Sequence, residues 1–157
     1  MIKFISLAIA VLALTNAVLA TDPEPNGMEA KIQIVENISD FKAAHPELEL
    51  LPMESVRSPR QQILYTVGSR VAGDQLVASV QDGWSWATLQ DVKLTLTYPT
   101  SGVGAVVSYV QVVVNQSSNL GQGYVVAGGI GQRYIQIVIQ AFQTSYFNYN
   151  AQVYGIY

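Results

Sequence analysis

The residue types that carry most enzyme chemistry are scarce in this chain. It has no cysteine, and its one histidine, His45, stands beside Pro46 in an acidic stretch, as a solvated loop residue would. The stretch 83–87 (GWSWA) is one residue short of the Gly-x-Ser-x-Gly turn that exposes a nucleophilic serine, and no histidine follows it. The chain therefore lacks the catalytic or metal-binding residues of thiol proteases, zinc hydrolases and histidine-dependent hydrolases.

Carboxylates are the remaining route to catalysis, because a glycosidase needs only a pair of acids. From residue 61 onward the acids are Asp74, Asp82 and Asp91, and each lies in or beside a turn signal. Aspartate in such a position usually accepts a hydrogen bond from its own backbone. We therefore predict no enzymatic activity, no catalytic residue, no metal site and no cofactor.

A glycine cluster formed by Gly128, Gly129 and Gly131, followed by Gln132, stands between two runs rich in β-branched residues. Glycine-rich turns can aim backbone amides at a phosphate, but a phosphate-binding loop continues into Lys-Ser or Lys-Thr and then a helix. Here Arg133 follows and leads into a strand pattern. We expect these four residues to form a structural turn in which glycine supplies positive φ.

Period-two patterns dominate the chain after Arg60 and predict β-strands. In the run 91–98, Val92, Leu94 and Leu96 alternate with polar residues, as a half-buried strand requires. The connections are short, and no long amphipathic helix is evident. This pattern favours an all-β fold, a single antiparallel sandwich or open barrel of about seven strands. The predicted strands are 61–68, 75–81, 90–98, 105–114, 122–128, 133–142 and 147–154.

The first twenty residues have the pattern of a secretory signal peptide, with Lys3, an apolar run over 4–14 and a small-residue exit ending at Ala20. The apolar run is shorter than the ~20 residues that span a bilayer, so we expect no stable membrane insertion after cleavage. Residues 1–20 are thus predicted to direct the protein into the secretory pathway, which predicts a secreted, extracellular protein. Asn37 and Asn115 lie in Asn-x-Ser sequons and are candidate glycosylation sites.

The segment 21–60 carries most of the acidic residues and several prolines, which predicts an acidic, loosely structured arm before a β domain at 61–157. Within the arm, residues 39–44 could form a helical turn capped by Ser39 and ended by Pro46. The chain has a formal net charge of −3, and its cations are scattered. Direct nucleic-acid binding normally needs a clustered basic patch, so we predict none.

One predicted surface is suited to binding. If strands 133–142 and 147–154 form a hairpin, the side opposite the core displays uncharged amides and aromatic rings. Such a surface suits contact with a protein or a glycan. Alternatively, a second sheet covers it and satisfies the amides. Trp84 and Trp86 either cover an edge of the core or stack against a ligand. The candidate binding face is Tyr134, Gln136, Gln140, Phe142, Asn148, Asn150, Gln152 and Tyr154.

The glycine cluster resembles part of a family signature when it is taken with the motif Val153-Tyr154-Gly155 near the C-terminus. Together with the motif at 73–77 and Tyr98-Pro99, these residues resemble the insect multiprotein bridging factor 2 family. The resemblance runs roughly from residue 65 to 154. It implies either a co-activator that bridges a DNA-bound regulator to the transcription machinery or, as in most members, a small secreted product of arthropod saliva, venom or body fluid. The segment 141–146, predicted as a hairpin loop, departs from the family pattern.

Three functions remain open at this stage. The leading hypothesis is a secreted, non-enzymatic β-domain that binds an unidentified protein or glycan, such as a salivary, venom or haemolymph component. The first alternative is a transcription co-activator acting through protein contacts, which a leaderless product starting at Met28 would permit. The second is a small-ligand or carbohydrate binder that uses Trp84 and Trp86 at the mouth of a barrel.

Overall fold

The computed structural model describes residues 27–35 and 41–157. The predicted signal peptide, the sequon at Asn37 and the predicted cap Ser39 lie outside the described residues. In the described ranges the only helix is the single turn α1 (Phe41–Ala44), inside the segment where a helical turn is expected. No helix there is long and apolar enough to cross a membrane.

The strands form one antiparallel sheet of eight strands, which confirms the predicted all-β fold. The order along the sheet is β1-β5-β8-β6-β4-β3, and β7 pairs with β8 and with β2. The sheet is open and does not close into a barrel. The strands are β1 (Glu29–Val35), β2 (Leu51–Pro52), β3 (Glu54–Ser58), β4 (Gln62–Gly68), β5 (Gln75–Tyr98), β6 (Val106–Gln116), β7 (Gly121–Gly128) and β8 (Ile135–Ile156).

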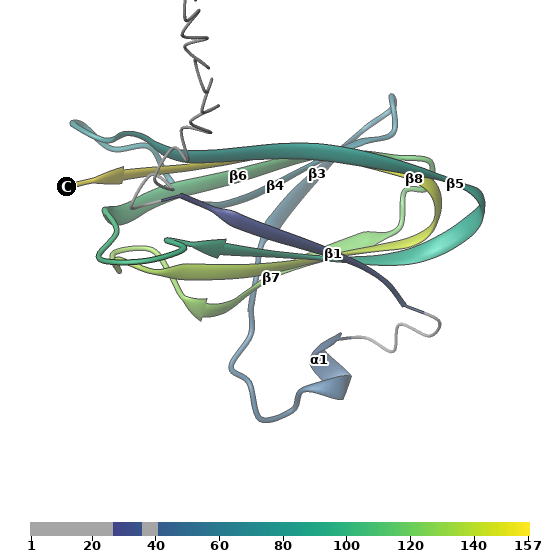
Figure 1. Cartoon of the computed structure of the whole chain (residues 1–157), viewed down its shortest axis with the longest axis horizontal. Helices are drawn as coiled ribbons and strands as arrows, with labels where there is room; N and C mark the ends of the chain where they lie inside the picture. The colour runs from purple at the N-terminus through teal and green to yellow at the C-terminus, as the bar shows by residue number, and fades with distance from the viewer. Residues whose placement is uncertain (1–26, 36–40) are drawn as a thin grey trace, which may run out of the picture.

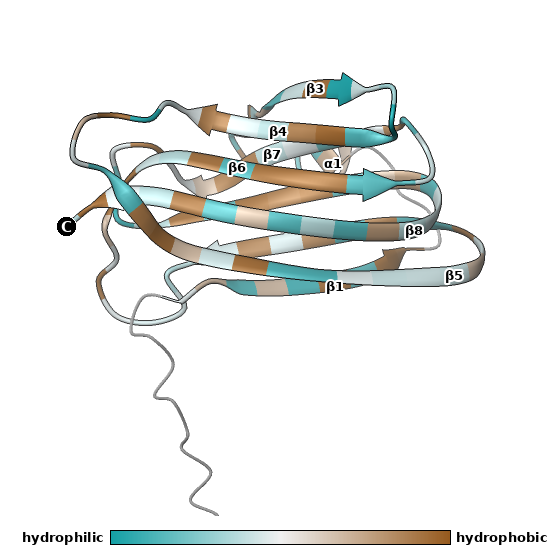
Figure 2. Ribbon diagram, turned by 90° about the horizontal axis from the view of Figure 1, so that it is seen from above, coloured by the Kyte–Doolittle hydropathy of each residue, from teal (hydrophilic) through white to brown (hydrophobic). Residues whose placement is uncertain are grey.

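Two long bent strands, β5 and β8, fold this sheet into two layers (Figure 1). Residues 75–85 of β5 pair with 146–155 of β8, whereas 90–98 pair with 135–144. The first layer therefore contains β1, the last part of β5, the first part of β8, β7 and β2. The second layer contains the first part of β5, the last part of β8, β6, β4 and β3 (Figure 2).

The core lies between the layers and is supplied by alternate residues of each strand. In β6, Val110, Val112 and Val114 are fully buried, whereas Asn115 is exposed on the opposite side. This alternation is what a sheet with one face on the core and one in water requires. The largest fully buried side chains include Tyr65, Tyr98, Phe147, Leu94 and Ile139.

The predicted hairpin at 141–146 is wrong, and so is the predicted division of residues 75–98 into two separate strands. The segments 75–81 and 90–98 are both parts of β5, and 133–142 and 147–154 largely coincide with two parts of β8. Register shifts between Ser85 and Val92 mark the bend of β5, and Gln143 has a φ of 51° at the bend of β8. Irregularities of this kind redirect a strand without ending it.

Three strands lie within the segment predicted as an acidic arm. β1 pairs with β5, β2 with β7 and β3 with β4. Met53, between β2 and β3, belongs to the core. Arg57 of β3 donates to the carbonyl oxygens of Asn119 and Gly121 at 2.9 and 2.8 Å. The described part of this segment is therefore joined to the β domain by backbone pairing.

Candidate protein-interaction face

The outer side of the second layer carries a surface of amide and aromatic side chains. It forms because β5, β8 and β6 turn alternate residues away from the core and their registers align in rows. None of its side chains is charged. We define the polar face by the residues Ser79, Gln81, Tyr109, Gln111, Asn115, Asn148, Asn150, Gln152 and Tyr154.

Hydrogen bonds between strands hold part of the polar face in place. Gln111 Nε2 donates to Gln152 Oε1 at 3.0 Å, and Asn150 Nδ2 donates to Gln81 Oε1 at 3.3 Å. The Tyr154 hydroxyl donates to the same Gln152 Oε1 at 3.1 Å. The first two bonds join neighbouring strands and the third lies within β8. Together they orient the amides before any partner arrives, which lowers the entropy cost of binding.

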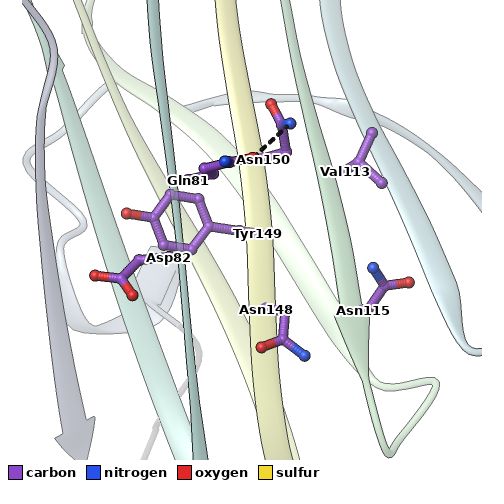
Figure 3. Close-up of a pocket in the computed structure, with 7 residues that line it drawn as sticks. All are labelled: Gln81, Asp82, Val113, Asn115, Asn148, Tyr149 and Asn150. Carbon is purple, nitrogen blue, oxygen red and sulfur yellow. Dashed lines mark hydrogen bonds between the residues drawn. The ribbon is translucent and has the colours of Figure 1, made fainter.

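The polar face is hollowed at its end near Asn115 and Asn148. An open pocket of about 430 Å³ lies over β5, β8 and β6, and Figure 3 shows the side chains around it. Asn115 and Asn148 are exposed there and come from neighbouring strands at the same register position. The pocket offers neutral donors and acceptors to a partner, with Asp82 as its one charged residue. Its lining residues are Gln81, Asp82, Val113, Asn115, Asn148, Tyr149 and Asn150.

A salt bridge closes one end of the polar face. Arg70 Nη2 lies 2.8 Å from Asp74 Oδ1, and the Arg70 guanidinium lies 3.8 Å from the centre of the Tyr154 ring. Asp74 also accepts from the Val71 N–H at 2.9 Å and from the Ser108 hydroxyl at 2.8 Å. These bonds, led by the one from Arg70, lower the pKa of Asp74 to about 2. The loop between β4 and β5 is thereby fixed against β6 and β8.

The predicted binding face is divided between the two layers. Asn148, Asn150, Gln152 and Tyr154 lie on the polar face. Gln136 and Gln140 pair with the first layer, and Phe142 lies near the bend of β8. Gln140 is 1% exposed, so it offers no surface to a partner. Tyr134 precedes β8 and lies outside the strand. The prediction of one shared face is wrong because β8 is one bent strand and not a hairpin.

Sequence reasoning missed the half of the polar face that comes from β5 and β6. Ser79, Gln81, Tyr109, Gln111 and Asn115 are outward positions of their strands, which the period-two pattern indicates. That pattern does not say which strands are neighbours in the sheet. A search for outward polar residues on every strand would have found them as candidates.

The two tryptophans belong to the edge of the core. Trp84 stacks on Tyr149, with 6.0 Å between ring centres, and Trp86 packs against the same core. Between the layers, the space lined by Met28, Leu96 and other apolar residues leaves no room for a water molecule. This space between the layers therefore offers no cavity to a ligand.

The acids and the histidine do not form a reactive cluster in the part of the chain that the structure describes. Asp82 accepts from the Gly83 N–H and Asp91 from the Gln143 N–H, each at 2.8 Å. His45 lies on the surface, 3.2 Å from Glu47. No group of three potential metal-ligating side chains occurs among these residues.

The glycine cluster forms the connection between β7 and β8 and contacts β6. Gly128, Gly129 and Gly131 have φ angles of 63°, 146° and 80°. Gly129 donates from its N–H to the Tyr134 carbonyl oxygen at 3.0 Å, and Gln132 to the Gly129 carbonyl oxygen at 3.1 Å. The Gly131 N–H donates to the Val107 carbonyl oxygen at 2.8 Å. The backbone amides of this turn are thus used inside the fold.

Comparison with known proteins identifies the family. The family model described as transcription activator MBF2 matches residues 67–155, more than half of the chain. No curated protein and no solved structure matches it. The leading hypothesis of a secreted extracellular binder is contradicted by this match, because the family is described as a transcription activator, which agrees better with the co-activator alternative. By this match and by the residues that carry the resemblance, the chain belongs to the MBF2 transcription activator family.

Proposed function

We propose that this protein is a non-enzymatic transcription activator that acts by binding another protein and not by contacting DNA. The family match is the observation that carries the proposal. The charge distribution and the polar face support it independently.

At least five of the seven cations in the described residues make contacts within the fold. Arg57 donates to two carbonyl oxygens, Arg70 pairs with Asp74, and Arg133 donates to the Gly104 carbonyl oxygen. Lys31 pairs with Glu29, and Lys93 lies 5.8 Å from the centre of the Phe41 ring. DNA binding rests on a cluster of cations that displace counterions from phosphates. This distribution favours an activator that reaches DNA through a partner.

The polar face has the chemistry of a protein-binding surface. It combines tyrosine rings with neutral amides, and protein interfaces are enriched in aromatic residues and depleted in lysine and glutamate. Tyr109 and Tyr154 lie 5.9 Å apart between ring centres and provide an aromatic contact at one end. Asn115 and Asn148 provide exposed amides that line the pocket.

The second part of the proposal concerns the cellular compartment in which the protein acts. A product starting at Met28 would omit the predicted signal peptide and retain every described strand, because β1 begins at Glu29. Asn115 is an exposed sequon residue and therefore reports the route taken. A chain that passes through the endoplasmic reticulum is expected to gain a glycan there, and a chain that stays in the cytosol and nucleus is not.

A tethered reporter assay tests the function. The full chain is fused to a heterologous DNA-binding domain, and reporter transcription is expected to rise above that of the DNA-binding domain alone. Asn148→Arg, which places a charge at an exposed position of the polar face beside the pocket, is expected to reduce activation several-fold. The matched control is Gln33→Arg, which adds the same charge at an exposed position of β1 in the first layer.

Two results would overturn the proposal. One is a silent reporter when the fusion is folded and nuclear. The other is recovery of the native protein only outside cells, with a glycan on Asn115 that an endoglycosidase removes. Equal activation by Asn148→Arg and by the wild type would remove the polar face from the function.

A further inference from the structure

The first part of β5 forms a free edge of the second layer. Residues 75–85 pair with β8 on one side, and within the described residues no strand pairs with their other side. Unpaired edges attract other strands, so proteins usually protect them with charges, prolines or covering segments. The edge of β3 is protected in this way, because the Arg57 side chain donates to carbonyl oxygens beyond that strand. Residues 75–85 contain no proline, lysine or arginine, and Asp82 is their one charged residue.

One hydrogen bond shows which backbone groups face outward from this edge. The Gly83 N–H donates to the side chain of Asp82 and is therefore outside the ladder with β8. In an antiparallel ladder, alternate residues point their N–H and C=O groups the same way. Gln81 and Ser79 thus also direct their backbone groups away from β8. A new strand would find outward donors and acceptors at residues 79 and 81, whereas the Gly83 N–H already donates to the Asp82 carboxylate.

An apolar groove runs beside the same edge. Gly27, Met28, Leu76, Val77, Ala78 and Ser79 line an opening of about 290 Å³ where the start of β1 faces the start of β5. Leu76 is 49% exposed, and Met28, Val77 and Val80 pack only partly against the core. An added strand would cover these side chains and gain the free energy of burying them.

Asp82 supplies a charge at the other end of the edge. It is exposed, and no cation pairs with it among the described residues. Ala78 and Asp82 lie on the same side of the strand because they are an even number of residues apart. At ~3.4 Å per residue the two positions are roughly 14 Å apart. A partner strand could therefore place an apolar residue at the groove and a basic residue at Asp82, four positions away.

We propose that the free edge of β5 at residues 75–85 binds an extended basic segment of another protein, which joins the sheet as an additional antiparallel strand. The apolar groove takes an apolar side chain of that segment, and Asp82 takes a lysine or arginine. A second copy of this chain fits less well, because its own 75–85 edge carries Asp82 and no cation. The inference rests on the proposed function in one respect, namely that the partner is a protein.

Peptide binding to the full-length protein tests this site. The probe is a fluorescein-labelled peptide of alternating valine and threonine in which a lysine precedes a leucine by four positions. We expect it to bind the wild type, and we expect at least tenfold weaker binding to Ser79→Pro. Proline at this position removes an outward N–H and leaves the ladder with β8 intact. The matched control Ser79→Thr keeps the N–H and is expected to bind like the wild type.

Two further measurements keep the test independent of how Ser79→Pro folds. Methylation of the peptide nitrogens on the side that faces β5 is expected to abolish binding to the wild type. Asp82→Asn is expected to reduce at least fivefold the preference for the lysine peptide over one with glutamate at that position. Absence of peptide binding to the wild type, or equal binding of the methylated peptide, would overturn the inference.

The peptide assay and the reporter assay can fail separately. A silent reporter with intact peptide binding would remove the activator role and leave the strand-addition site. Activation that persists in Ser79→Pro, without peptide binding to the wild type, would remove the site and leave the activator role.

Discussion

Gly128 and Gly131 lie in the same turn but are constrained differently. A Cβ atom on Gly128 would lie 2.0 Å from the backbone oxygen of Tyr134, whereas a Cβ atom on Gly131 would meet nothing within 4 Å. Both residues have positive φ, which a side chain makes unfavourable. A side chain at Gly131 is therefore opposed only by the backbone conformation, whereas a side chain at Gly128 would also clash with the backbone of Tyr134.

We expect Gly131→Val to lower the free energy of unfolding by about 1–3 kcal/mol, the usual cost of this strain. Gly128→Val is expected to cost more, because the backbone at Tyr134 must also move. Urea unfolding of both variants measures the difference. A Gly128→Val protein as stable as Gly131→Val would show that the close approach to Tyr134 is not a constraint.

Asp74 makes the stability of the fold depend on acid pH. Its folded-state pKa is lowered to about 2 from the ordinary value of 3.8, mainly by the hydrogen bond from Arg70. A lowered pKa stabilises the folded state fully above about pH 4, and this contribution is lost as the pH falls towards 2. The wild type is therefore expected to lose more stability than Asp74→Asn between pH 4 and pH 2. The urea unfolding midpoints of the two proteins across this pH range give the comparison. If both midpoints fell by the same amount, the loss of stability would belong to other acidic residues.

At the scale of elements, the bends of β5 and β8 decide the arrangement of the sheet. Each strand contributes to both layers, so its outward residues face opposite sides of the molecule before and after the bend. Gln143, with a φ of 51°, adopts the bent conformation without being a glycine. The Asp91 side chain accepts from its N–H at 2.8 Å and holds the bend of β8 against β5.

The bend of β8 should resist a β-branched residue. Valine is strongly disfavoured at positive φ, so Gln143→Val is expected to lower the free energy of unfolding by about 1–3 kcal/mol. Gln143→Gly relieves the strain and costs some unfolded-chain entropy, so its net effect is expected to be smaller. Thermal unfolding of the two variants tests this order. A valine variant as stable as the glycine variant would mean that the bend does not depend on this residue's conformation.

At the scale of the whole molecule, one sheet with shared strands leaves two kinds of binding surface. The polar face presents side chains, whereas the free edge of β5 presents backbone groups beside the apolar groove. They adjoin each other, because Ser79 and Gln81 belong to the polar face and also to the edge strand. A partner protein could therefore engage both at once, which would make Asn148→Arg and Ser79→Pro act on the same binding event.

The sequence by itself determined the β character of the chain, most strand positions and the family. These follow from local signals, namely period-two alternation, glycines at the turn of 128–131 and the spacing of short motifs. Only the tertiary structure decided that 135–156 is one bent strand, that Gln140 is buried while Asn148 is exposed, and that Gln111 meets Gln152. Strand neighbours are set by pairing between residues far apart in the chain, and a bend in a continuous strand looks like a turn in the sequence. The free edge of β5 is likewise a consequence of the strand order, which no local pattern encodes.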